Sequence, residues 1–411
     1  MFIRAYGSAV YGVNAYTIAV EVNVSGDGGK FNMVGLPDIA VKESWTRIMT
    51  AFKNNDLHFP RKKIVVNLSP ADIKKEGSAY DLTIAMAILA ADSQLYNNID
   101  IENYIIMGEL SMDGSVLPIK GALPIAVQAR KEGFKGFILP LQNVKEAALV
   151  DGLEVIGVRN IDELVKHFKR EVLLLPCQDN PLEEFKHASC DFDLDFSDVQ
   201  GQENIKRAME IAAAGGHNII LIGPPGAGKT MLAKRLPSIL PPMTLEEALE
   251  TTKIHSVAGK IGENGGLIAR RPFRSPHHTI SDVALVGGGN HPQPGEISLA
   301  HNGVLFLDEL PEFKRTVLEV MRQPLEDRKV NIARARFSVD YPSGFMLVAS
   351  MNPCPCGYFN HPDKDCTCGM PVVQKYLSRI SGPLLDRIDI HIEVTPVSFD
   401  ELASRKRNNE K

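Results

Sequence analysis

The sequence predicts an α/β protein in which an α+β domain precedes a domain built on a parallel sheet. Residues 223–230 read Gly-Pro-Pro-Gly-Ala-Gly-Lys-Thr, follow the apolar run 218–222 and precede a segment suited to a helix start. A second apolar run, 304–307, ends in two adjacent carboxylates. A buried strand, a glycine-rich loop and a helix in this order are the context in which phosphate-binding loops occur. These observations predict the second domain.

The first domain is predicted over residues 1–172, where strand-like and helix-like segments alternate. The expected strands are 64–68, 105–108 and 136–140, and the expected helices are 82–91 and 121–132. Residues 173–195 contain Pro176, Pro181 and several acidic residues, a composition typical of a linker. The second domain is expected over 196–396, and 397–411 is a polar tail.

The glycine-rich segment predicts a site for a nucleoside triphosphate with Mg²⁺. Its glycines allow backbone N–H groups to surround phosphate oxygens at the start of a helix. The residues expected to contact nucleotide are Gly223, Pro224, Pro225, Gly226, Ala227, Gly228, Lys229 and Thr230. Lys229 is expected to reach the terminal phosphates, and the Thr230 hydroxyl to bind Mg²⁺. The alternative is a glycine-rich turn that fits the pattern by chance.

The two carboxylates that follow the strand 304–307 are Asp308 and Glu309. Asp308 is expected to hold Mg²⁺, and Glu309 to act as general base on the attacking water. A strand that ends in an acidic turn is the alternative interpretation. Two carboxylates downstream of a phosphate loop favour hydrolysis of ATP over binding alone.

Length and composition exclude several classes of protein. The chain has 411 residues, 44% hydrophobic and 23% charged, which is typical of a globular protein with two or three domains. Its net charge of -5 argues against a basic coat for nucleic acid but leaves room for a local basic surface. No apolar run reaches membrane-spanning length, and the start of the chain does not read as a signal peptide. We expect a cytoplasmic protein without a membrane partner.

Several further segments carry a resemblance to a known family. They are 198–202 (Asp-Val-Gln-Gly-Gln), 211–218 (Ile-Ala-Ala-Ala-Gly-Gly-His-Asn) and 295–309, which runs from Gly-Glu-Ile-Ser into the carboxylate pair. With the phosphate loop, they closely resemble magnesium-chelatase-like AAA+ ATPases of the YifB/ComM type. The resemblance implies a three-layer αβα phosphate-loop domain with a parallel sheet and a hexameric ring of identical subunits. It also implies hydrolysis of ATP, and ComM-type members are understood to drive branch migration of DNA.

The resemblance assigns roles to further residues. Asn352 ends an expected strand, 345–351, and resembles the polar sensor that orients the hydrolytic water. Arg387 lies in 382–389, which resembles the segment that carries the arginine finger acting in trans, and Arg379 competes for that role. A structural pair of Arg387 with Asp386 or Asp389 is the alternative. Val199 is expected to line the adenine pocket.

The first domain resembles the proteolytic domain of Lon, but its catalytic residues differ. The segment 108–121 parallels the Lon stretch before the catalytic lysine, and Ile125 stands where that lysine is expected. The nucleophilic serine falls on Ala79, with Ser78 one position away. A Ser–Lys dyad requires a base within hydrogen-bond reach of the hydroxyl. We therefore expect a non-proteolytic domain.

Four cysteines form a separate pattern after Asn352. Cys354, Cys356, Cys366 and Cys368 offer thiolates that suit a tetrahedral Zn²⁺ site. The alternative is four reduced, free thiols. Clustered cysteines favour a reducing compartment and a metal over disulfides, and Cys177 and Cys190 carry no further pattern.

Two basic groups are candidates for contact with single- or double-stranded DNA. The first is Arg270, Arg271, Arg274, His277 and His278. The second is Arg328, Lys329, Arg334 and Arg336, on an expected β-hairpin, of which Arg334 and Arg336 are the preferred pair. Basic side chains in a channel follow phosphates without reading sequence. Solvated charge and contacts between subunits are the alternatives.

Three functions remain open at this point. The favoured one is a ring-forming motor that converts ATP hydrolysis into movement along DNA. A protein-remodelling ATPase is the first alternative, and a magnesium-chelatase ATPase subunit, which is not expected to carry a Lon-like domain, is the second. The family's helical lid is not expected within this chain, because the sequence ends at Lys411, so turnover by the chain alone is in question.

Overall fold

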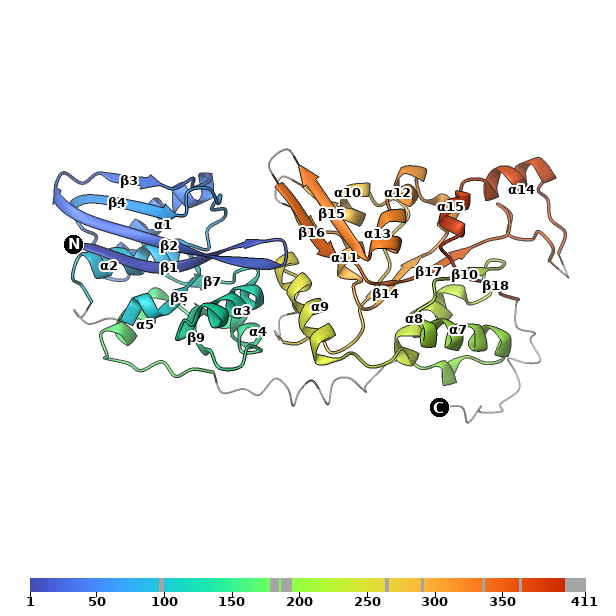
Figure 1. Cartoon of the computed structure of the whole chain (residues 1–411), viewed down its shortest axis with the longest axis horizontal. Helices are drawn as coiled ribbons and strands as arrows, with labels where there is room; N and C mark the ends of the chain where they lie inside the picture. Colours follow the sequence, from blue (N-terminus) through green and yellow to red (C-terminus); the bar gives the residue numbers. More distant parts are fainter. Residues whose placement is uncertain are drawn as a thin grey trace. The chain divides into compact units, whose positions relative to one another are not determined.

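The structure is a computed structural model that describes residues 1–95, 100–177, 185, 194–262, 266–289, 292–334, 337–361 and 364–395. Two compact units divide the chain. The first comprises Met1–Glu184 and His255–Leu267, and the second comprises Phe185–Ile254 and Ile268–Lys411. Figure 1 labels their helices and strands.

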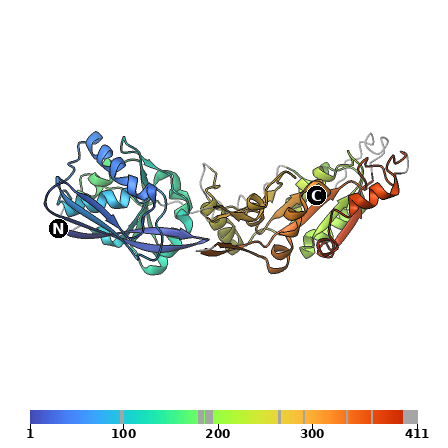
Figure 2. The same ribbon diagram turned by 90° about the horizontal axis from the view of Figure 1, so that it is seen from above.

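A seven-stranded sheet forms the frame of the first unit, in the order β3-β4-β2-β1-β5-β8-β9. Strands β1, β2 and β4 are antiparallel neighbours, whereas β1, β5, β8 and β9 run parallel. The long β1–β2 hairpin is drawn in dark blue and is visible in both views (Figures 1 and 2). The strands are β1 (Phe2–Tyr11), β2 (Asn14–Asp27), β3 (Phe31–Val34), β4 (Lys62–Ser69), β5 (Tyr104–Ile106), β8 (Gly136–Pro140) and β9 (Glu154–Val158).

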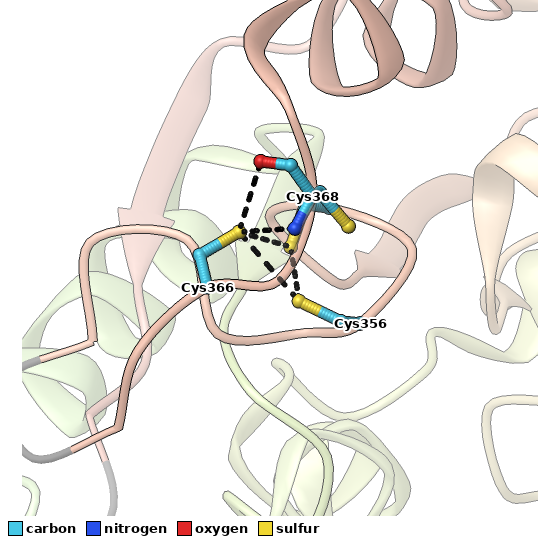
Figure 3. A group of neighbouring side chains, drawn as sticks. Cys356, Cys366 and Cys368 are labelled. Atoms are coloured by element: carbon cyan, nitrogen blue, oxygen red, sulfur yellow. Dashed lines mark hydrogen bonds between the residues drawn. The ribbon is translucent and has the colours of Figure 1, made fainter.

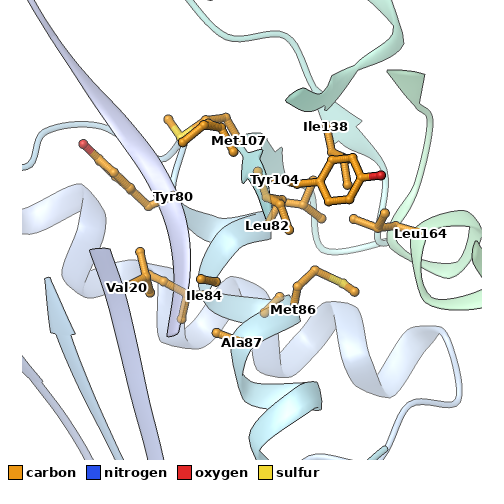
Figure 4. Packing of buried hydrophobic residues seen from close by; sticks show 14 of the residues in the cluster. Val20, Tyr80, Leu82, Ile84, Met86, Ala87, Tyr104, Met107, Ile138 and Leu164 are labelled. Atoms are coloured by element: carbon orange, nitrogen blue, oxygen red, sulfur yellow. The ribbon is translucent and has the colours of Figure 1, made fainter. Parts of the chain in front are cut away.

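Helix α2 (Asp81–Ala91) is the centre of the first unit's core. Every one of its residues is buried, so the helix has no solvent face. Figure 4 shows its side chains Leu82, Ile84 and Met86 packed among residues from the strands. The remaining elements of this unit are α1 (Ile39–Asn54), η1 (Asp100–Asn103), β6 (Glu109–Leu110), β7 (Val116–Leu117), α3 (Ala122–Glu132), η2 (Leu141–Asn143), α4 (Val144–Ala147) and α5 (Ile161–Phe168).

A five-stranded sheet forms the frame of the second unit, in the order β11-β14-β17-β10-β18. All four neighbouring pairs are parallel. The strands are β10 (Ile219–Ile222), β11 (Phe273–Arg274), β14 (Val304–Leu307), β17 (Met346–Met351) and β18 (Ile390–Glu393). Strands β10, β14 and β17 are almost entirely buried apolar runs, as expected for a parallel sheet covered on both faces.

The other described elements follow in chain order. They are η3 (Phe196–Asp198), α7 (Glu203–Gly215), α8 (Lys229–Ile239), α9 (Leu245–Ala258), α10 (Asp282–Val286), β12 (Gly287–Gly288), β13 (Gln293–Pro294), α11 (Glu296–Leu299), η4 (Leu310–Glu312), α12 (Arg315–Glu319), α13 (Arg322–Asp327), β15 (Lys329–Arg334), β16 (Phe337–Pro342), α14 (Met370–Leu377) and α15 (Gly382–Leu385). None of the helices within the described ranges combines the length and the apolar character needed to cross a bilayer.

The α/β class expected from the sequence is confirmed. The strands expected at 64–68 and 136–140 correspond to β4 and β8, and the one at 105–108 to the shorter β5. The strand 345–351 corresponds to β17, which lies between β10 and β14. The hairpin expected around Arg328 and Arg336 is formed by β15 and β16. Arg336 itself, Cys190, most of the expected linker and the tail 397–411 lie outside the described residues.

Candidate functional site

The phosphate-loop segment forms the turn between β10 and α8. Gly226 and Gly228 have φ angles of 80° and 85°, which an L side chain rarely adopts. Gly223 permits a close approach, because a Cβ there would lie 2.3 Å from the carbonyl oxygen of Val394 on the neighbouring strand segment. The loop therefore requires glycine at these positions. Residues 225–231 of this loop line a pocket. Residues at the ends of β14 and β17 complete its lining, and they are Asp308, Glu309, Ser350, Met351 and Asn352.

Lys229 is the cation of this pocket. Only 9% of the residue is exposed, and Nζ donates to the carbonyl oxygens of Gly223 (2.7 Å) and Pro224 (2.9 Å) and to Oδ1 of Asn352 (3.1 Å). Burial lowers the pKa of Lys229, and the charges of Asp308 and Glu309 oppose that shift. A desolvated ammonium held by neutral oxygens gains strongly from an anionic ligand. The pocket is thus prepared for phosphate.

Asp308 is fixed by hydroxyl groups from two different elements. Thr230 Oγ1, at the start of α8, donates to Oδ2 at 2.8 Å, and the buried Ser350 Oγ of β17 donates to Oδ1. Carboxylate and hydroxyl oxygens are the ligands that Mg²⁺ prefers. The donor set at Thr230 and Asp308 fits this ion. Ser350 was not predicted from the sequence. The feature that could have indicated it is its position as a polar residue within an otherwise apolar strand.

Glu309 has an unusual backbone and an exposed side chain. Its φ of 55° is rare for a residue with a side chain and occurs often at functional sites. The side chain is 57% exposed, and Nδ1 of His278 lies 3.7 Å from Oε2. Sequence analysis grouped His278 with DNA-contact candidates, but the structure places it beside the expected general base.

The two arginine-finger candidates lie outside the pocket lining. Arg387 pairs with Glu326 of α13 and donates to the Pro383 carbonyl, so its structural partner is neither Asp386 nor Asp389. Arg379 donates to Glu312 Oε1 at 3.0 Å and to the Pro311 carbonyl at 3.3 Å, in the turn after Glu309. An arginine that acts on a neighbouring subunit is expected outside its own chain's pocket, so both assignments remain predictions.

Comparison with known proteins identifies the family. The family described as magnesium chelatase, subunit ChlI, matches residues 195–402, and a second description, subunit ChlI of Mg-chelatase, matches residues 20–143. The chain belongs to the magnesium-chelatase ChlI family. It is 44% identical over 390 residues to the uncharacterized protein YifB of Salmonella typhimurium, covering 94% of this chain and 74% of that one. It is 42% identical over 390 residues to the competence protein ComM of Haemophilus influenzae, covering 95% and 75% respectively.

The ChlI-family chain also shares similarity with a protease in its first unit. It is 33% identical over 159 residues to Lon protease 2 of Bacillus subtilis, covering 35% of this chain and 27% of the protease. Ile125, at the position expected for the catalytic lysine, is buried in the core cluster. Ser78 Oγ donates to the Glu109 carboxylate, and Lys75, which is buried, donates to the Pro70 carbonyl. The non-proteolytic assignment remains a prediction that these contacts support.

The assignments of Val199 and of the basic candidates remain predictions, and the structure gives their surroundings. Val199 is 1% exposed and belongs to the core cluster of the second unit. Arg271 donates to carbonyl oxygens of Pro241 and Asn302 and pairs with Glu247. Arg274 forms two bonds, of 2.6 and 2.8 Å, with the Glu296 carboxylate. These guanidinium groups are engaged within the chain. Arg334 ends β15 on the hairpin, as expected.

The four cysteines after Asn352 lie close together, and Figure 3 labels Cys356, Cys366 and Cys368 among them. The sulfur atoms of Cys354, Cys356 and Cys366 are 3.3, 3.7 and 3.6 Å apart in pairs, and all four sulfur atoms lie within 4.8 Å of one another. The backbone N–H of Tyr358 lowers the pKa of the Cys356 thiol well below its usual range. The cluster is arranged to hold a thiophilic metal ion.

Replacing Lys229 tests the phosphate pocket. Lys229→Ala is expected to weaken ATP binding by about 1.5–3 kcal/mol, roughly 10- to 150-fold, because it removes a charge-assisted contact to phosphate. Equilibrium titration with a fluorescent ATP analogue measures this. Lys234→Ala removes an exposed lysine from the same helix and is the matched control. Equal affinities for the Lys229 variant and the parent would contradict the assignment.

Proposed function

We propose that this ChlI-family chain binds and hydrolyses ATP with Mg²⁺ as a subunit of a ring-forming motor that acts on DNA. The observation that carries the ATPase part is the contact between Thr230 and Asp308, which links the phosphate loop to the end of β14 at 2.8 Å. With Lys229 on the same loop and Glu309 next to Asp308, one pocket contains a phosphate-binding cation, an Mg²⁺ donor set and a base.

In the proposed reaction each residue has a distinct task. Lys229 exchanges its carbonyl partners for the terminal phosphates, and Thr230 and Asp308 would hold Mg²⁺. The ion, when bound, would neutralise charge that develops on the phosphate oxygens. Glu309 takes a proton from the attacking water, and Asn352, which already contacts Lys229 Nζ, positions that water. Hydrolysis thus needs groups from the ends of three strands.

Replacing Glu309 separates binding from hydrolysis. Glu309→Gln is expected to retain ATP affinity and to lose turnover roughly 10²- to 10⁴-fold, because an amide does not accept the proton from water. Phosphate release and fluorescent-nucleotide titration measure the two quantities. Glu246→Gln, at an exposed carboxylate on α9, is the control. Equal turnover of the Glu309 variant and an active parent would remove Glu309 from its catalytic role.

We propose that Arg387 completes the site of a neighbouring subunit in a hexamer. Its guanidinium now pairs with Glu326, and Nε is buried without a hydrogen-bond partner among the described residues. An arginine with unused donor capacity can exchange an intramolecular carboxylate for a phosphate, since both accept the same planar donor group. Arg379 is the alternative finger.

The DNA part of the proposal rests on two observations. One relative, from Haemophilus influenzae, is named a competence protein. The chain also carries Arg334 on the β15–β16 hairpin and Arg336, which lies outside the described residues. Basic side chains at the end of a hairpin are suited to contact a phosphate backbone independently of sequence.

A double replacement tests this DNA contact. Arg334→Ala with Arg336→Ala is expected to weaken binding of single- and double-stranded DNA and to reduce the log–log salt slope by about 0.7–0.9 for each lost phosphate contact. Fluorescence anisotropy across a salt series measures both. Arg61→Ala with Lys63→Ala removes two exposed charges at the same spacing and is the control. DNA that neither binds nor stimulates the parent's ATPase would favour the protein-remodelling alternative.

We propose Zn²⁺ as the ion of the four-cysteine cluster. With Zn–S bonds of about 2.3 Å, a tetrahedral site has S···S edges of about 3.8 Å. The pairs among Cys354, Cys356 and Cys366 lie at 3.3–3.7 Å, close to these edges and far longer than a disulfide bond of about 2.05 Å. The geometry therefore favours a metal over an oxidised pair.

Metal analysis tests the ion directly. Protein purified without chelators is expected to contain about one Zn²⁺ per chain, because a structural site uses four protein ligands per ion. Cys356→Ser with Cys366→Ser is expected to lose it, whereas Cys177→Ser, a cysteine packed against the first unit's core, is expected to keep it. Negligible zinc with four freely titratable thiols would contradict the proposal.

A further inference from the structure

The four-cysteine loop is joined to the nucleotide pocket through its chain connection. Met351 and Asn352 line the pocket, and Cys354 follows two residues later. Cys354 is 0% exposed, and its sulfur is one of the converging group. Asn352, the pocket residue that follows β17, is therefore separated from a candidate metal ligand by a single residue, Pro353. A displacement of this ligand would be transmitted to Asn352 along a short, stiff segment.

A second contact joins the loop to the phosphate loop itself. Residues 354–357 form a turn in which the Gly357 N–H donates to the Cys354 carbonyl at 3.0 Å. Gly357 is buried and has a φ of 85°. A Cβ on Gly357 would lie only 2.5 Å from Cδ of Pro225, which lines the pocket. The backbone of the cysteine turn thus packs directly against the phosphate loop.

A third contact comes from the helix that follows the cysteines. Helix α14 begins with Gly369 as its N-cap, immediately after Cys368. Its residue Tyr376 is 6% exposed; burial raises the pKa of its hydroxyl to about 12, and the backbone amide of Asn352 opposes that shift. Asn352 is thus joined to the start of the cluster by the chain itself and lies near Tyr376 of the helix that follows the cluster. A metal that held the cysteines together would therefore restrain both the chain that leads from Asn352 to Cys354 and the helix α14 that carries Tyr376.

The loop itself contains little that would fix its shape without a metal. Among its described residues between Asn352 and Met370, only Cys354 and Gly357 are buried. Such a segment has no apolar core of its own to offset the entropy of ordering. In small thiolate sites the free energy of metal binding is the free energy of folding. A metal held by cysteines from both ends of the loop would supply the missing cross-link.

We propose that the metal-loaded cysteine loop is a structural part of the nucleotide site, so that metal occupancy sets the affinity for ATP through Pro225 and Asn352. The inference rests on the proposed metal site and ATP site and adds their coupling. With the metal bound, the turn at Gly357 supports the phosphate loop, and Asn352 is held beside Lys229. Without it, both supports loosen, and the pocket loses its preorganised geometry while the sheet beneath remains intact.

The experiment measures nucleotide affinity against metal content in the full chain. Protein loaded with Zn²⁺ is titrated with a fluorescent ATP analogue in Mg²⁺ buffer, then stripped with a zinc-selective chelator, titrated again and reloaded with Zn²⁺. The dissociation constant is expected to rise at least about tenfold on stripping, the factor that corresponds to 1.4 kcal/mol, and to return on reloading. Cys177→Ser is expected to respond as the parent does.

Hydrogen exchange and a second variant separate the coupling from loss of fold. On stripping, peptides over Pro224–Thr230 are expected to exchange faster, whereas amides of β10 keep their protection. Gly357→Ala is expected to retain zinc but to weaken nucleotide binding about tenfold, because the added Cβ meets Pro225 and the φ angle is unfavourable.

The outcomes are distinguishable. Loaded protein that binds no ATP would contradict the proposed function itself, and protein that never holds zinc would overturn the metal site and this inference with it. Loaded protein that binds ATP, and whose affinity is the same after stripping and in the Gly357 variant, would overturn the coupling alone. Loss of β10 protection on stripping would also overturn it, because the metal would then support the whole unit.

Discussion

The alignment of β10, β14 and β17 in one parallel sheet is the constraint on which the site depends. Parallel strands end at the same edge, so the residues that follow them meet there although they are far apart in the chain. Pairing of Leu221 with Ser350, and of Leu307 with Ala349, places Ser350 beside Asp308. A slip of one residue in β17 would turn Ser350 away and remove that hydroxyl from the carboxylate.

The electrostatics of the pocket follow from burial within this frame. Lys229 is buried, and its hydrogen bonds among the described residues go to neutral oxygens, while Asp308 accepts from two hydroxyl groups. The Lys229 ammonium and the Asp308 carboxylate thus line the same pocket, and the described contacts include no ion pair between them. An anionic ligand and a divalent ion would each find a partner already oriented, which reduces the reorganisation that binding requires.

Sequence patterns predicted the parts of the site that are local and missed those that are set by tertiary packing. The phosphate loop and the pair at Asp308 are contiguous motifs whose flanking apolar runs also predict β10 and β14. The long β1–β2 hairpin was not predicted, because its two strands contain no long uninterrupted run of apolar residues. Ser350 and His278 carry no motif, and only the fold brings them to Asp308 and Glu309. The alternative interpretation of Arg387 was a structural pair with Asp386 or Asp389, whereas the structure pairs it with Glu326 on another helix.

The cysteine loop illustrates why a site cannot be understood from its motif alone. Four clustered thiols predict a metal site wherever they occur, but the effect of that metal on the rest of the protein depends on which segments the cluster contacts. Here the turn at Gly357 touches Pro225, and the chain from Asn352 to Cys354 contains one intervening residue. A metal cross-link elsewhere on the surface would stabilise its own loop and little else. At this position it would stabilise the loop against which the phosphate-binding segment packs, so the local stability of that loop and the affinity for ligand would be linked.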